Sequence, residues 1–220
     1  MEIKKLWGGI KTKDCETCNK EDCNGRLNYE SLCANINYLK EYDEKNYEKN
    51  RETFAELKKL MGSEKPAIFS FGCGIALDYI GAKEVFGDNG VYYPIDECEW
   101  AIKGTENFRN FKPELPKRTM SLKEGMMLLT MTPQDAIICF FNSLFTISEN
   151  TDLKKQLLSA LRTKKNFYFV CDYTMNANLH MASTEMEFIK NLLKQLEQQF
   201  SFKKLEILGG KGIIVLGMRK

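Results

Sequence analysis

The chain has 220 residues, of which 43% are hydrophobic and 28% charged, and its formal net charge is +2. This composition is typical of one globular domain with at most a small appendage, and it argues against disorder. Residues 1–62 hold equal numbers of basic and acidic residues, which makes a nucleic-acid partner unlikely on charge. No apolar run reaches the roughly 20 residues of a transmembrane helix. We therefore expect a cytoplasmic protein without a membrane partner, whose eight cysteines do not form disulfides.

Four cysteines near the N-terminus lie in a polar stretch, where burial in a core does not explain them. We call them the N-terminal cysteine cluster: Cys15, Cys18, Cys23 and Cys33. The first two form one CxxC pair, as in many zinc sites, but the other gaps are irregular. Because residues 10–26 have almost no apolar side chains, metal coordination could order this segment. The pattern predicts a structural zinc site, with an iron–sulfur cluster or uncoordinated thiols as alternatives.

The next stretch, residues 26–61, contains neither glycine nor proline. Apolar residues recur at helical spacing near both of its ends, and the residues between them are nearly all polar. This pattern predicts two helices, or one long helix with a solvated middle. We expect residues 1–62 to form a cysteine-bearing loop and helical cap on a domain of residues 63–220.

In that domain, short apolar runs alternate with helical patterns. The runs are residues 67–71, 91–96, a weak one at 118–122, 135–141 and 166–172. Apolar strands separated by helices predict a parallel sheet covered on both faces. The last stretch, KKLEIL-GGKG-IIVLGM, has no room for a helix, so it predicts a hairpin with an antiparallel final strand. Thr184 and Glu187 predict a capping box at the start of the last helix.

The first apolar run leads into Gly72-Cys73-Gly74, here called the glycine turn, and then into a helical pattern. Glycines without side chains allow a ligand to approach the backbone closely, and a helix start offers unpaired N–H groups. About twenty residues further on, the second run ends at Asp96, a position from which a carboxylate can bind ribose hydroxyls. The two features together predict a nucleoside-cofactor site at the carboxyl ends of the first two strands.

These segments and the closing hairpin resemble class I S-adenosylmethionine (SAM)-dependent methyltransferases over residues 65–220. The resemblance implies a three-layer Rossmann-like α/β sandwich, with a seven-stranded, mostly parallel sheet and one antiparallel hairpin strand. The family usually has an acid tied to the cofactor's amino-acid moiety where this chain has Ser70, and a third glycine where it has Ala76. The cofactor-binding residues that the resemblance implies are Ser70, Gly72, Cys73, Gly74, Asp96 and, after the fourth strand, Asn142.

The implied activity is methyl transfer from SAM to a small molecule or a protein side chain. Such a reaction mainly requires alignment of the two reactants, so no catalytic residue is assigned. Two alternatives stay open. One is a non-catalytic methyltransferase-like binding protein, which the replacement of the acid by Ser70 favours. The other is an RNA-modifying methyltransferase with an N-terminal zinc module.

Overall fold

The structure is a computed structural model. It describes residues 32–74, 76–96, 119–134, 136–142, 151–172, 179–206 and 212–220. The helices are α2 (Leu32–Met61), α3 (Leu77–Phe86), α5 (Leu122–Met131), α7 (Thr151–Leu161) and α8 (Leu179–Leu196), with a short 3-10 helix η2 (Gly87–Asn89). The strands are β1 (Ala67–Phe71), β2 (Val91–Ile95), β3 (Ala136–Asn142), β4 (Asn166–Asp172), β5 (Phe200–Glu206) and β6 (Gly212–Arg219).

The strands form one mixed sheet in the order β2-β1-β3-β4-β6-β5. The first four are parallel, and β6 runs antiparallel to both β4 and β5, as the terminal hairpin predicts. The weak run at 118–122 is reduced to a single parallel bridge between Ile95 and Met120. The described residues therefore form six strands, with this bridge where the expected seven-stranded sheet has its outermost strand.

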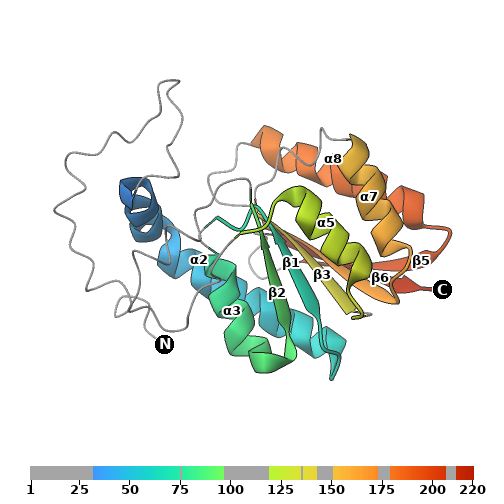
Figure 1. The fold of residues 1–220 in the computed structure, drawn as a ribbon, viewed down its shortest axis with the longest axis horizontal. Coiled ribbons are helices and arrows are strands. Elements are labelled where there is room, and N and C mark those ends of the chain that lie inside the picture. The colour runs from blue at the N-terminus through green and yellow to red at the C-terminus, as the bar shows by residue number, and fades with distance from the viewer. Residues whose placement is uncertain are drawn as a thin grey trace.

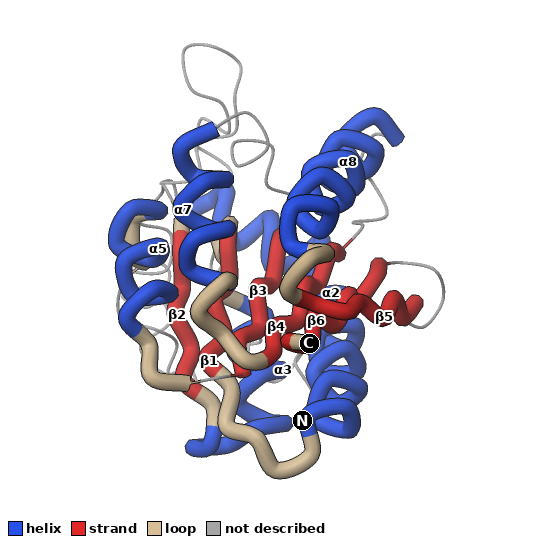
Figure 2. Tube along the Cα trace, turned by 90° about the vertical axis from the view of Figure 1, so that its right-hand side faces the viewer, coloured by secondary structure: helices blue, strands red, loops and turns tan. Residues whose placement is uncertain are grey.

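The sheet is covered on both faces, which gives the predicted three layers (Figures 1 and 2). Helices α5, α7 and α8 pack on one face and share a core with alternate residues of the strands. Helices α2 and α3 pack on the other face around the remaining strand residues. All five residues of β1 are buried, because a central parallel strand has no face toward water. Its continuous apolar run is the sequence signature of this position.

Helix α2 is one continuous helix of 30 residues, which decides between the two predicted arrangements of residues 26–61. Its C-terminal half buries Phe54 and Leu57 completely against the sheet. It also crosses α3 closely, since a Cβ added at Gly81 would lie 3.0 Å from the backbone nitrogen of Arg51. The N-terminal half extends away from the sheet in Figure 1. None of the described helices is long and apolar enough to cross a membrane.

The capping box predicted for the last helix is absent, and another one lies at the start of α5. The predicted box at Thr184 and Glu187 is wrong, because α8 already begins at Leu179 and both residues lie inside it. A capping box does occur at the start of α5. There the Ser121 side chain accepts a hydrogen bond from the backbone N–H of Glu124, and the Glu124 carboxylate accepts one from the backbone N–H of Ser121.

Candidate cofactor-binding site

The glycine turn joins the carboxyl end of β1 to the start of α3. Its backbone is left-handed at Gly72 (φ 68°) and Gly74 (φ 53°), and Ala76, which precedes α3, is also left-handed (φ 58°). The conformation suits glycine, whereas it costs about 1–2 kcal/mol for alanine. The turn is held by β2, because the Ile95 carbonyl accepts hydrogen bonds from the backbone N–H groups of Gly72 (2.8 Å) and Cys73 (3.2 Å).

Asp96 lies directly against this turn. Its Oδ2 accepts a hydrogen bond of 2.8 Å from the backbone N–H of Gly74, although 22 positions separate the two residues. The backbone N–H of Asp96 donates to the Met120 carbonyl at 3.0 Å, so the outer bridge of the sheet fixes its position. The structure thus brings the glycine turn and Asp96 together at the carboxyl ends of β1 and β2.

A second carboxylate, which the sequence analysis did not single out, lies behind the glycine turn. Asp78, in the first turn of α3, is only 2% exposed. The Tyr92 hydroxyl of β2 donates to its Oδ2 at 2.7 Å, and Ser70 of β1 forms hydrogen bonds with both side chains. Ser70 itself is fully buried. Its hydroxyl therefore joins β1 to α3 and β2.

Burial sets the ionisation of this region. It raises the pKa of Asp78 to about 6, against the lowering effect of hydrogen bonds from Ser70, Tyr92 and the backbone N–H groups of Asp78 and Tyr79. Burial, together with the charges of Asp78 and Asp96, also raises the pKa of the Cys73 thiol well above its usual range. Since the thiolate is the reactive form of cysteine, Cys73 is an unreactive thiol at neutral pH.

The remaining predicted residues are only partly described. Asn142 is the last residue of β3 and pairs with Asp172 at the end of β4, so its backbone lies at the carboxyl edge of the sheet. Cys33 lies in the first turn of α2, with its side chain outside the described part. Cys15, Cys18 and Cys23 lie outside the described residues altogether. Within the described ranges, no group of three or more His, Cys, Asp or Glu residues could hold a metal ion.

The arrangement suits a ligand with vicinal hydroxyls. Gly72, Gly74 and Asp96 are all partly exposed at this edge, which is where open α/β sheets bind their ligands. A carboxylate offers about four lone-pair positions, of which the Gly74 N–H occupies one on Asp96. The nearby N-terminus of α3 adds a positive backbone dipole. Together these groups fit a nucleoside better than an apolar ligand.

Solved structures of other proteins share the fold that carries this site, whereas sequence comparisons find no match. No family model matches the sequence, and no curated protein matches it. An O-methyltransferase family protein from Burkholderia thailandensis superposes with a TM-score of 0.56 at 9% identity, covering 86% of this chain and 60% of that chain. The plantazolicin methyltransferase BpumL, solved with S-adenosylhomocysteine (SAH), gives 0.52 at 12% identity, covering 84% and 88%. A SAM-dependent methyltransferase from Aquifex aeolicus gives 0.51 at 17% identity, covering 84% and 98%.

These likenesses show the fold of the chain. It is the Rossmann-like fold of class I SAM-dependent methyltransferases, as the sequence resemblance implies. Its structural neighbours include enzymes described as acting on different acceptors, so the fold leaves the methyl acceptor undetermined.

Proposed function

We propose that this chain binds SAM and is a methyltransferase that acts on a small molecule or a protein side chain. The observation that carries the proposal is the hydrogen bond between the Gly74 N–H and Asp96 Oδ2. It places a carboxylate suited to ribose beside a backbone turn that a ligand can approach closely. The fold supports the same conclusion, since BpumL has this fold and was solved with SAH.

In this proposal the residues of the site have separate tasks. Gly72 and Gly74 allow the cofactor to approach the backbone, and Asp96 accepts hydrogen bonds from the ribose hydroxyls. Bound SAM supplies a methyl group on a positively charged sulfur, ready for displacement by a nucleophile. The protein's main contribution is to align the acceptor with that methyl group. Asn142, at the end of β3, is proposed to lie on the acceptor side of the site.

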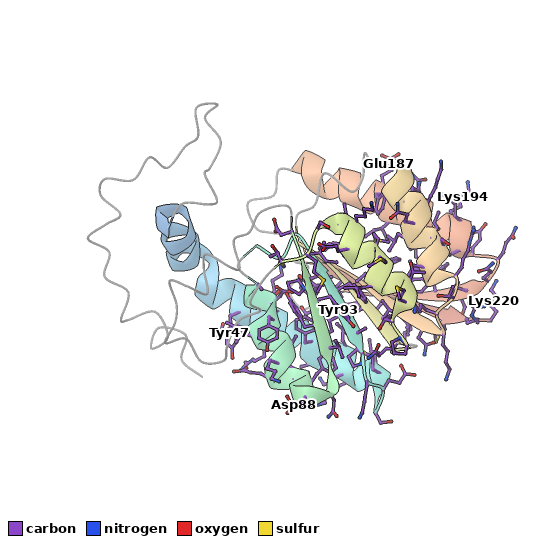
Figure 3. All side chains as sticks on the ribbon, in the orientation of Figure 1. Tyr47, Asp88, Tyr93, Glu187, Lys194 and Lys220 are labelled. Carbon is purple, nitrogen blue, oxygen red and sulfur yellow. The ribbon has the colours of Figure 1, made fainter. Side chains whose placement is uncertain are left out.

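Isothermal titration calorimetry with SAM and SAH tests the cofactor site. We expect Asp96→Ala to weaken binding by about 1–3 kcal/mol, because buried ribose hydroxyls lose a charged partner. The matched control is Asp88→Ala. Asp88 follows α3 at the end remote from the glycine turn (Figure 3), and its side chain is 96% exposed, so its removal should leave affinity unchanged. A well-folded wild-type protein that binds neither compound would disprove the proposal.

Turnover is a separate question from binding. Incubation with radiolabelled SAM and extracts of small molecules or proteins should transfer label to an acceptor if the chain is an enzyme. Binding without any transfer would favour the non-catalytic alternative, which the position of Ser70, buried and bonded to Asp78 and Tyr92, also motivates.

We further propose that residues 1–62 form a cap beside the site and that the N-terminal cysteine cluster binds one structural zinc ion. The long α2 supports the cap, because its C-terminal half packs on the sheet and its N-terminal half extends beyond the sheet in Figure 1. Cys33 at the start of α2 would connect a zinc-ordered loop to this helix. Zinc bound by four thiolates would order the segment through coordination.

A further inference from the structure

Asp78 is a buried carboxylate whose partners are all neutral. In the part of the chain that the structure describes, its hydrogen bonds come from Tyr92, Ser70 and two backbone N–H groups of its own helix turn. No lysine or arginine pairs with it among these residues. Buried carboxylates are ordinarily paired with a cation or a metal, because an isolated buried charge is costly. Among the described residues, Asp78 is therefore a buried acid without a cationic partner.

The hydrogen bonds suit a carboxylate. Four donors point at Asp78, and its two oxygens can accept all of them, whereas an amide would offer one oxygen and turn its NH2 group toward donors. Asp78 does sit at the N-terminal end of α3, where the helix dipole favours a negative charge. However, that benefit does not offset burial, since the balance still leaves the carboxyl harder to ionise than usual. Burial therefore makes the charged form of Asp78 costly even with these hydrogen bonds.

The carboxylate of Asp78 lies close to the glycine turn. Asp78 follows the glycine turn by four residues, and Asp96 contacts the turn at Gly74. Burial is the main cause that raises the pKa of the Cys73 thiol, in the middle of the turn, and the charges of Asp78 and Asp96 raise it further. The turn that we propose to carry the cofactor therefore lies near two carboxylates. A cationic ligand placed there would supply a positive charge that the described residues around Asp78 do not supply.

We propose that Asp78 is a positioning residue of the cofactor site, whose negative charge behind the glycine turn selects for a ligand that carries a positive charge. This inference rests on the proposed function, and it names the property of SAM that the site would recognise, its sulfonium. Asp78 is buried and does not touch the ligand. Its negative charge acts on the ligand through space, and its helix α3 holds the glycine turn that contacts the ligand.

The charge of Asp78 should also make binding depend on pH. Among the described residues, Asp78 interacts with Ser70 from β1, Tyr92 from β2 and Cys73 in the turn. Cys73 and Tyr92 have pKa values raised well above the ordinary range, so both stay protonated between pH 5 and 7.5. The Tyr79 ring lies edge-on against the Tyr92 ring, with 5.1 Å between the ring centroids. Protonation of Asp78 as the pH falls through about 6 removes the charge.

Calorimetry with three related ligands tests this inference. SAM carries one net positive charge, SAH is a zwitterion without the sulfonium, and 5′-methylthioadenosine lacks the amino-acid part. At pH 7.5 we expect Asp78→Asn to weaken SAM binding roughly ten- to thirtyfold, because one unit of negative charge is removed from a partly desolvated site. SAH should lose clearly less, and 5′-methylthioadenosine should change less than about twofold. Asp88→Asn, an exposed acid after the same helix, is the matched control.

The pH profile of the wild-type protein tests the same charge without a mutation. SAM affinity should fall as the pH is lowered from 7.5 to 5, and at pH 6 binding should release protons, measured by titration in two buffers of different ionisation enthalpy. In Asp78→Asn both effects should disappear. Equal losses for all three ligands, or no proton release in the wild type, would overturn the inference while leaving the cofactor site standing. Wild-type protein that binds none of the ligands would refute the proposed function and this inference with it.

Discussion

The buried carboxyl of Asp78 predicts an unusual dependence of stability on pH. Its pKa is about 6 in the folded protein against an ordinary value of 3.8. Between these two values the folded state holds a proton that the unfolded state has lost. The contribution of this group to the free energy of unfolding is therefore fully present below pH 3.8 and is lost as the pH rises through about 6. The shift of about 2 units, at about 1.36 kcal/mol per unit, corresponds to a loss on the order of 3 kcal/mol.

Urea denaturation of wild-type protein and Asp78→Asn at pH 4.5, 5.5, 6.5 and 7.5 measures this loss. Comparing the two proteins cancels the carboxyl groups that they share. We expect Asp78→Asn to gain stability relative to the wild type as the pH rises, by about 2 kcal/mol between pH 4.5 and 7.5, because about a third of the total is already lost at pH 4.5. Asp88→Asn should show a small change of the opposite sign, because pairing with Lys83 lowers the pKa of Asp88. A difference between wild type and Asp78→Asn that stays constant with pH would refute the reasoning.

Three further predictions concern packing and metal binding. Gly217→Ala should destabilise the protein by about 3 kcal/mol or more in urea denaturation, because the new Cβ would lie 2.3 Å from Cζ of the fully buried Phe167; unchanged stability would show that this core can shift. Gly125→Ala, whose Cβ would lie 2.4 Å from Cδ1 of Ile95, should weaken SAM binding in calorimetry, since the Ile95 carbonyl holds the glycine turn; unaltered affinity would contradict this coupling. Elemental analysis of protein purified without a metal-affinity tag should find one zinc per chain, and substoichiometric metal with all four cluster thiols titratable would argue for uncoordinated thiols.

Much of the fold could be predicted because its physical causes are local in the sequence. An all-apolar strand such as residues 67–71 indicates burial on both faces, and the short closing hairpin allows only an antiparallel return. The meeting of Gly74 and Asp96 also followed, since parallel strands that are neighbours end at the same edge. These inferences need only the type and order of the elements, which periodicity reveals.

Asp78 was missed for a different reason. An acid in the first turn of a helix is common, because it favours the positive end of the dipole, and such residues are usually exposed. Its burial depends on the packing of α3 against the sheet, and its partner Tyr92 is found only from the register of β1 and β2. The wrong capping box at Thr184 has a similar origin. The motif marks a possible helix start, but residues from Leu179 onward already continue the helix.

The place of β6 in the sheet has a consequence for how the chain folds. This strand follows all the others in sequence, yet it lies between β4 and β5 and pairs with both. Until residues 212–219 are in place, β4 exposes one unpaired edge, and β5 has no strand beside it. Unpaired edges are templates for association with other chains, and late, long-range pairing is slow. A nascent or destabilised chain should therefore be most prone to aggregation at the edge of β4, which only β6 covers.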